Sequence, residues 1–142
     1  MGAKNLLRAL FAGVVGTAVM TAFTYLAPMM GMPPMNIPMM LSSFLGVSIF
    51  LGWIMHFSIG SMLAIIYSFV CNYLPSIGWK NGAIYGIFPW LVAQIVVMPM
   101  MGMGLFSGSF VMAMGSFVGH LIYGGTVGFV YASCCQRSSS AK

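Results

Sequence analysis

The chain has 142 residues, of which 61% are hydrophobic and 4% are charged, and it contains no Asp or Glu. A water-soluble domain carries about 25% charged residues, so most of this surface must face something other than water, and we expect a lipid bilayer. The missing carboxylates exclude carboxylate-pair catalysis, Ser-His-Asp triads and acidic calcium or magnesium sites within this chain, and its five cations are too scattered for a nucleic-acid surface.

The first long apolar stretch covers about residues 9–28, enough to cross a bilayer as a helix, which takes about 20 residues. The residues before it have the charged start of a signal peptide, but the apolar run continues for a full span, so we expect a retained helix. Thr17, Thr21 and Thr24 follow one another at helical spacing on this span. We predict that they form hydrogen bonds to neighbouring helices.

A methionine-rich stretch, PMMGMPPMNIPMM at residues 28–40, follows the first span and holds six methionines in thirteen positions. Clustered thioethers can bind copper(I), yet methionine is also a flexible apolar filler. Pro33, Pro34 and Pro38 stiffen the stretch and spread its side chains. We therefore predict a hydrophobic cap over the outer end of a helix bundle, with residues 36–46 forming a re-entrant or interfacial segment.

Three further apolar stretches, at about residues 50–74, 82–101 and 110–135, complete four predicted transmembrane helices. Pro89 in the third stretch predicts a kink. In the fourth, Gly115 and Gly119 share one helical face, and Gly124 continues a different face that begins at His120. Small residues allow helices to approach closely, so we predict that this helix packs on two sides and is central.

The positive charges predict the orientation of the bundle. The segments on one side of the spans carry all five cations, and those on the other side carry none. The five cations are Lys4, Arg8, Lys80, Arg137 and Lys142. Cytoplasmic connections are enriched in Lys and Arg, so both termini are expected in the cytoplasm. The methionine-rich stretch is then expected at the outer face.

An internal repeat relates the two halves of the chain. The pentapeptide PMMGM occurs at 28–32 and 99–103, each time before a helix that carries a histidine. At a constant offset of 64 residues four pairs match: His56 with His120, Gly60 with Gly124, Tyr67 with Tyr131 and Cys71 with Cys135. We interpret residues 1–142 as one all-α transmembrane domain of two tandem helical hairpins, about 9–74 and 82–135, related by an axis along the membrane normal.

Three sequence blocks, GWIMHFSIG, VVMPMMGMGLF and HLIYGGTVGFVY, resemble a family of small bacterial four-helix inner-membrane proteins known only as a domain of unknown function. The resemblance extends over about residues 13–131. It implies a multi-pass protein of the bacterial inner membrane and brings no established activity. The family's third span ends more like VMPMAGAG, so Met100, Met101 and Met103 depart from its pattern, which weakens a copper interpretation based on methionine count.

The two histidines are the candidate site. Ionisable side chains within a span are rare and face the bundle interior, and the repeat places His56 and His120 at similar depth, roughly 22–27 Å from the inner edge. Haem b could bind through both imidazoles, with Gly60 and Gly124 leaving room for the porphyrin. Copper(I) is the other cofactor considered, and its candidate ligands are His56, His120, Met100 and Met101. Alternatively, the site holds no cofactor, and each histidine bonds a hydroxyl or a carbonyl on a neighbouring helix.

These features favour a non-enzymatic accessory or interaction subunit of a larger bacterial membrane complex, for example a respiratory one. The short connections and glycine-lined helix faces motivate this prediction, with lipid and another membrane protein or a second copy as partners and no nucleic acid. The alternative is a small oligomeric transporter or channel for copper or another small solute. Four spans enclose little interior, so transport would need a dimer.

Overall fold

The computed structural model describes residues 3–74 and 78–139, and every regular element over those residues is helical. Four helices are long and apolar enough to cross a membrane: Asn5–Met30, Ile49–Tyr73, Trp79–Met100 and Phe110–Ala132. They agree with the four predicted spans to within about one helical turn at each end. The all-helical fold with four candidate membrane-spanning helices is therefore confirmed.

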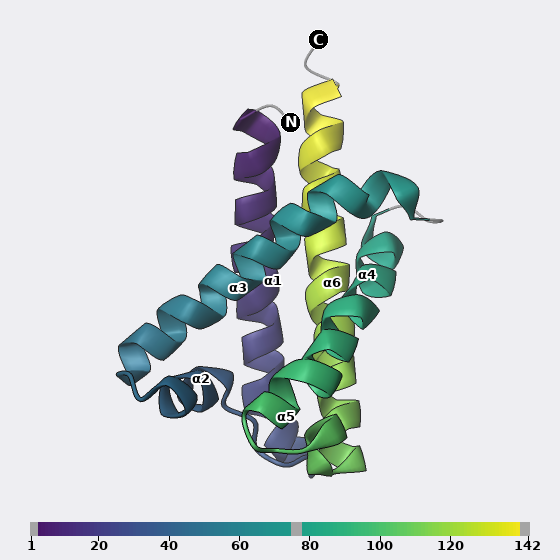
Figure 1. Ribbon diagram of the computed structural model, residues 1–142. Helices are drawn as coiled ribbons and strands as arrows, with labels where there is room; N and C mark the ends of the chain where they lie inside the picture. Colours follow the sequence, from purple (N-terminus) through teal and green to yellow (C-terminus); the bar gives the residue numbers. More distant parts are fainter. Residues whose placement is uncertain (1–2, 75–77, 140–142) are drawn as a thin grey trace.

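Six α-helices follow one another over the described residues (Figure 1), and shorter 3-10 or π-helical segments lie between them. The α-helices are α1 (Ala3–Leu26), α2 (Ile37–Leu45), α3 (Ile49–Val70), α4 (Trp79–Val92), α5 (Met98–Met100) and α6 (Phe110–Ser139). The start of α1, the start of α4 and the end of α6 lie toward one end of the bundle, which we call the termini end. Residues 28–40 and 98–103 lie at the opposite end, which we call the methionine end.

Helix α6 packs against both α1 and α4, and α1 in turn packs against α3. On one face Gly119 contacts Met20 of α1. On another face Gly124 and Gly128 meet Gly82 of α4 so closely that a Cβ on any of the three glycines would collide with backbone atoms of the facing helix. The prediction that this span packs on two sides is confirmed, and the α4–α6 contact depends on the absence of side chains.

Helices α1 and α3 approach each other through small residues in the same way. A Cβ added to Gly13 would lie 2.7 Å from the Cα of Ser61 and 2.9 Å from the Cβ of Ala64. A Cβ added to Gly60 would collide with the hydroxyl of Thr17. Gly60 and Ala64, which lie one turn apart on this histidine-bearing helix, are thus part of its contact with α1.

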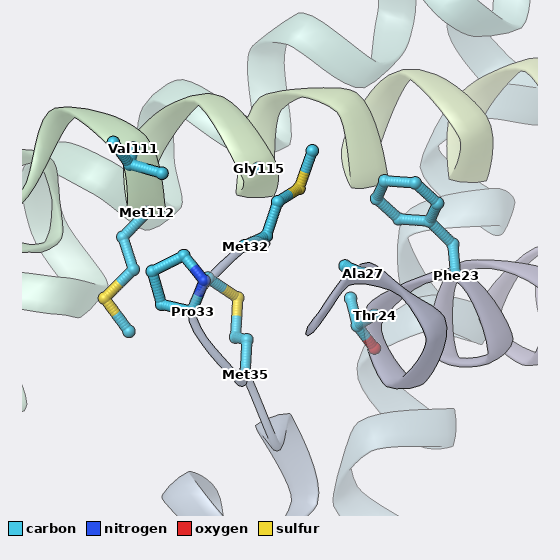
Figure 2. Close-up of a pocket in the computed structure, with 9 residues that line it drawn as sticks. All are labelled: Phe23, Thr24, Ala27, Met32, Pro33, Met35, Val111, Met112 and Gly115. Atoms are coloured by element: carbon cyan, nitrogen blue, oxygen red, sulfur yellow. The ribbon is translucent and has the colours of Figure 1, made fainter. Parts of the chain in front are cut away.

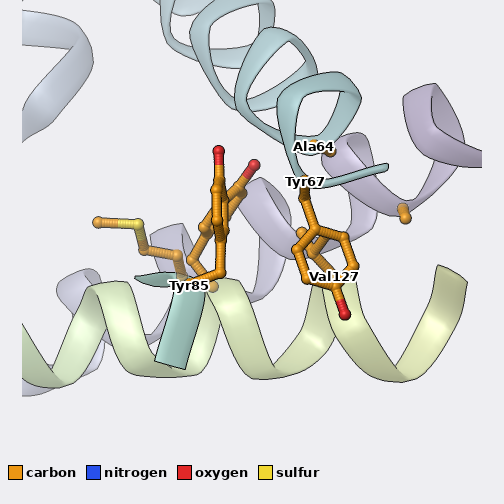
Figure 3. Packing of buried hydrophobic residues seen from close by; sticks show 7 residues of the cluster. Ala64, Tyr67, Tyr85 and Val127 are labelled. Carbon is orange, nitrogen blue, oxygen red and sulfur yellow. The ribbon is translucent and has the colours of Figure 1, made fainter. Parts of the chain in front are cut away.

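A cluster of buried tyrosines joins α3, α4 and α6 in the half of the bundle that includes the end of α3 and the start of α4, and Figure 3 shows two of them, Tyr67 and Tyr85. Tyr67 and Tyr85 meet edge to face with ring centroids 5.3 Å apart. The hydroxyl of Tyr85 donates to the carbonyl oxygen of Leu63 at 2.8 Å, and that of Tyr123 donates to the carbonyl oxygen of Gly60. Both bonds attach α3 to the α4–α6 pair in this half of the bundle.

Helix α2 forms most of the segment that the sequence marks as re-entrant or interfacial. The side chain of Asn36 caps it by accepting a hydrogen bond from the backbone N–H of Met39 at 3.0 Å. The helix ends at Gly46, whose φ of 65° suits a residue without a side chain. Helix α2 packs on the start of α3, where Gly52 lies against the carbonyl group of Pro38.

Candidate functional site: a cavity shared by two histidines

A cavity of about 340 Å³ lies between α3 and α4, which diverge from the tyrosine cluster toward the methionine end (Figure 1). Side chains from α1, α2, α5 and α6 complete its walls, and the lining is mostly apolar. His56 of α3 and His120 of α6 both line it. Its volume lies within the range of small-molecule pockets in proteins.

Thr21 of α1 fixes the ring of His56. The Nε2 atom of His56 lies 2.9 Å from the Thr21 hydroxyl, which donates its only proton to the carbonyl oxygen of Thr17 at 2.7 Å. The Thr21 oxygen must therefore accept from His56, so the ring proton is on Nε2 and the lone pair of the neutral ring is on Nδ1. An imidazolium is disfavoured in this apolar cavity because the chain has no carboxylate to balance it.

Only one of the three predicted threonine contacts reaches another helix. Thr21 binds His56, but Thr17 donates to the carbonyl oxygen of Gly13 and Thr24 donates to that of Thr21, both within α1. The prediction of bonds between helices is wrong for Thr17 and Thr24. A threonine in a helix always has a carbonyl oxygen of the preceding turn within reach, and in an apolar bundle that acceptor satisfies it.

The ring of His120 has the opposite tautomer. Its Nδ1 atom lies 2.8 Å from the carbonyl oxygen of Ser116, one turn earlier on α6. A carbonyl oxygen can only accept, so Nδ1 carries the proton and Nε2 carries the lone pair. Each histidine thus uses its N–H group to bond a helix and retains one nitrogen that can only accept or coordinate.

The two remaining ring nitrogens, Nδ1 of His56 and Nε2 of His120, make no hydrogen bond to any described residue. Over the described part of the chain, no fully buried side-chain nitrogen or oxygen lacks a partner. These nitrogens must therefore lie at an accessible surface, and the cavity is the surface that both residues line. The lining thus includes two imidazoles that each have one nitrogen without a hydrogen-bond partner among the described residues.

A buried network of hydrogen bonds reaches Ser116, the residue that bonds His120. Gln94 is 1% exposed, and its amide nitrogen donates to the hydroxyl of Ser116 at 3.2 Å. The hydroxyl of Ser107 donates to the amide oxygen of Gln94 at 2.8 Å. Ser107 itself has a left-handed backbone with φ 59°, so this bond links a strained turn to the helix that carries His120.

A π-helical segment, Ala93–Val97, positions Gln94. It begins four residues after Pro89, which lies inside α4, and it forms a wide turn of the same span. The kink at Pro89 itself stays a prediction. Sequence reasoning missed Gln94, Ser107 and Ser116. The available signal was the rarity of polar side chains such as Gln94 inside a transmembrane span.

The structure brings some of the predicted site residues together and separates others. His56, His120, Gly60 and Met101 line the cavity, whereas Met100 is 67% exposed and Gly124 packs against α4. The space beside Gly60 is taken by Thr17, so neither glycine leaves room for a porphyrin. Among the described residues, no group of three or more His, Cys, Asp or Glu side chains is placed to hold a metal ion.

Methionines supply much of the apolar wall. Six of them line the cavity: Met20, Met35, Met40, Met62, Met98 and Met101. Within the stretch 28–40, Met29 and Met30 are 85% and 62% exposed, so its thioethers point in different directions. Figure 2 shows Met32 and Met35 beside Pro33, around a crevice of about 10 Å³ that Gly115 of α6 also lines.

Comparison with curated proteins and with solved structures finds no match for this chain. The sequence pattern of the Family of unknown function DUF6789 matches residues 3–142, which is nearly the whole chain. The predicted resemblance to a family known only as a domain of unknown function is confirmed. The chain therefore belongs to DUF6789, and its four apolar helices and shared histidine cavity are the features from which a function can be argued.

Proposed function

We propose that this protein is a non-enzymatic, multi-pass membrane protein that binds a small lipid-soluble molecule or cofactor between His56 and His120, as an accessory subunit of a larger bacterial membrane complex. The observation that carries the proposal is that both histidines line one cavity of about 340 Å³. A purely structural histidine would also bond a hydroxyl or a carbonyl oxygen, as His56 bonds Thr21 and His120 bonds Ser116. What supports a ligand is that the second nitrogen of each ring has no partner among the described residues while both residues line the same cavity.

The position of the cavity favours a ligand taken from the bilayer. Helices α3 and α4 are both candidate spans, and they barely touch each other beyond the tyrosine cluster. The gap between them is bordered by apolar side chains such as Ile59, Met62 and Phe88. A lipid-soluble molecule can therefore reach the histidines without crossing water.

The location and orientation are part of the proposal. We place the protein in the bacterial inner membrane with both termini in the cytoplasm. In support, Lys4, Arg8, Lys80 and Arg137 all belong to helix segments at the termini end, and positive charge marks the cytoplasmic side. Lys142 lies outside the described residues.

The tandem repeat of residues 9–74 and 82–135 is also proposed. In support, Gly60 contacts α1 and the equivalent Gly124 contacts α4, so each lies where its helix meets its own hairpin partner. The contacts between the hairpins are unequal, because α1 packs closely on α6 while α3 and α4 diverge. The repeat can be tested by superposing the two hairpins of an experimental structure by a rotation about the membrane normal. A difference of more than roughly 11 Å, two helical turns, between the depths of His56 and His120 would contradict it.

Purification from the native membrane tests the ligand-binding proposal. We expect the protein to carry a small molecule, detected by its absorption spectrum and by mass spectrometry of an organic extract. His56→Phe and His120→Phe, which keep a ring of similar size, should lower its occupancy, and Ser58→Ala on the exposed side of α3 should not. Co-isolation with a stoichiometric membrane complex supports the accessory role.

A small oligomeric transporter for copper(I) is the second candidate, because six thioethers share the cavity with the two imidazoles. If it is correct, Met98→Leu with Met101→Leu should reduce the copper bound to the purified protein. Met29→Leu with Met30→Leu is the matched control, since both residues are exposed outside the cavity. A stable homo-oligomer that binds copper(I) would favour this candidate, and unchanged copper content in the cavity variant would contradict it.

A further inference from the structure

The polar atoms of the cavity wall are mostly hydrogen-bond acceptors. Three hydroxyl groups of described residues line it: Thr17 donates its proton to the carbonyl oxygen of Gly13, and Tyr123 donates to that of Gly60. The third, Ser116, accepts from the amide nitrogen of Gln94 and is the one hydroxyl here that does not donate to a carbonyl oxygen. The N–H groups of both histidines are bonded within the protein, as described above. A ligand with only acceptor atoms, such as a ketone or an ether, finds few donors here, whereas a donor finds two imidazole lone pairs.

The charge of the wall restricts the ligand further. None of the described residues that line the cavity is Lys or Arg, and the chain contains no Asp or Glu. A carboxylate or phosphate would be buried without a cation, and an ammonium group without an anion, and both are costly in apolar surroundings. The ligand head is therefore expected to be neutral.

We infer that the cavity binds a neutral, lipid-soluble molecule whose head donates hydrogen bonds from hydroxyl groups to His56 and His120, the chemistry of a phenol or a hydroquinone. The inference rests on the proposed ligand-binding function and names its ligand class. The aromatic or alkyl body lies against the methionines and aliphatic side chains of the wall, and a tail extends through the gap between α3 and α4 into the bilayer. The dimensions agree, because a pocket of about 340 Å³ suits an organic molecule, while a lone metal ion needs several donors converging on one point.

The experiment compares two probes of the same shape. The full chain, with its histidines labelled with ¹⁵N, is placed in phosphatidylcholine nanodiscs and titrated with decylhydroquinone or with the dimethyl ether of decylhydroquinone. Because only the first has O–H groups, we expect it to bind about tenfold more tightly or better. Its addition should shift the signals of the unprotonated nitrogens, Nδ1 of His56 and Nε2 of His120.

Variants add a second comparison. His56→Phe and His120→Phe should each reduce the difference in affinity between the two probes, whereas Ile59→Leu, a change elsewhere on the cavity wall, should preserve it. If a histidine variant does not fold, the comparison of diol and ether in the unaltered protein still decides the question. The ¹⁵N spectrum of the unaltered protein also gives the tautomers directly.

Three results would overturn the inference while leaving a ligand-binding function in place. They are equal affinity for the diol and the ether, the reverse tautomer on either histidine, and stoichiometric copper(I) or haem bound through the two rings. If neither probe binds and the protein from native membranes carries no small molecule, the proposed function fails together with the inference. Tighter binding of the diol with shifts at both nitrogens supports it.

Discussion

At the scale of the residue, a single hydroxyl group, that of Thr21, determines which ring nitrogen of His56 carries the proton. Thr21 accepts from His56 and donates to the carbonyl oxygen of Thr17, so one side chain both joins α1 to α3 and fixes which imidazole nitrogen is protonated. Outer partners of this kind orient functional histidines in metal and catalytic sites. Ser116 has the corresponding role for His120, through its carbonyl oxygen.

Thr21→Val tests this role because it keeps the shape of the side chain and removes the acceptor. The N–H of His56 is left without a partner, which should cost about 1–3 kcal/mol in the free energy of unfolding. Thr24→Val is the matched control, since that hydroxyl bonds only its own helix, and its cost should be smaller. Unfolding in mixed micelles measures both values, and equal losses would contradict the assigned role.

Gly60 is a second residue whose effect can be isolated. In Gly60→Ala the new methyl group would collide with the hydroxyl of Thr17, and overpacking of this kind typically costs about 1–3 kcal/mol. Adding Thr17→Ala removes the colliding oxygen and should restore part of the stability. Gly125→Ala is the control, because its Cβ would make only an ordinary contact of 3.7 Å. Failure of the double variant to recover any stability would show that α1 and α3 are separated by something other than this contact.

At the scale of the element, the third span consists of α4, the π-helical segment Ala93–Val97 and α5. Helix α4 holds the bundle through its glycine contact with α6, the π-helical segment turns Gln94 inward, and the turn after α5 returns Ser107 to it. An unbroken α-helix would point the residues after the wide turn in other directions, since each extra residue rotates the helix by about 100°. The wide turn thus couples the cavity wall to the connection before α6.

Gln94→Leu tests the coupling. The variant leaves the hydroxyls of Ser107 and Ser116 without their amide partner, at a cost of about 1–3 kcal/mol in unfolding free energy. Adding Ser107→Ala removes one of those hydroxyls, so the double variant should lose less than the sum of the two single losses. Strictly additive losses, measured in the same micelles, would contradict a shared network.

At the scale of the whole molecule, sequence patterns predict the membrane-spanning helices and their packed faces better than they predict the cavity. Length and hydropathy suffice for the four spans, and glycine spacing suffices for the two packed faces of α6. The cavity depends on the divergence of α3 from α4, which arises from contacts distant in sequence. Met100 and Met101 show what the sequence cannot predict about the site. Neighbours on a helix point about 100° apart, and only the structure shows that Met100 is exposed while Met101 lines the cavity.

The orientation of the whole molecule can be tested with single cysteines in a cysteine-free background. Labels at residues 1–8, near Lys80 and after Arg137 should be protected from a membrane-impermeant reagent added outside, because positive segments remain in the cytoplasm. A cysteine at Pro34, in the methionine-rich stretch, should react. Reaction near Lys80 with protection at Pro34 would reverse the proposed topology.

Helix α3 runs obliquely to α1 and α6 (Figure 1), and we predict that this path makes the protein sensitive to bilayer thickness. The span Ile49–Tyr73 has 25 residues and is roughly 37 Å long, which exceeds a hydrocarbon core of about 30 Å, and a helix that is too long accommodates by tilting. The tyrosine cluster anchors α3 in the half of the bundle that includes its end, so a change of tilt moves the start of the helix, beside the cavity. Lipids with longer chains would bring α3 upright and alter the gap to α4, so ligand affinity should depend on acyl-chain length in reconstituted membranes.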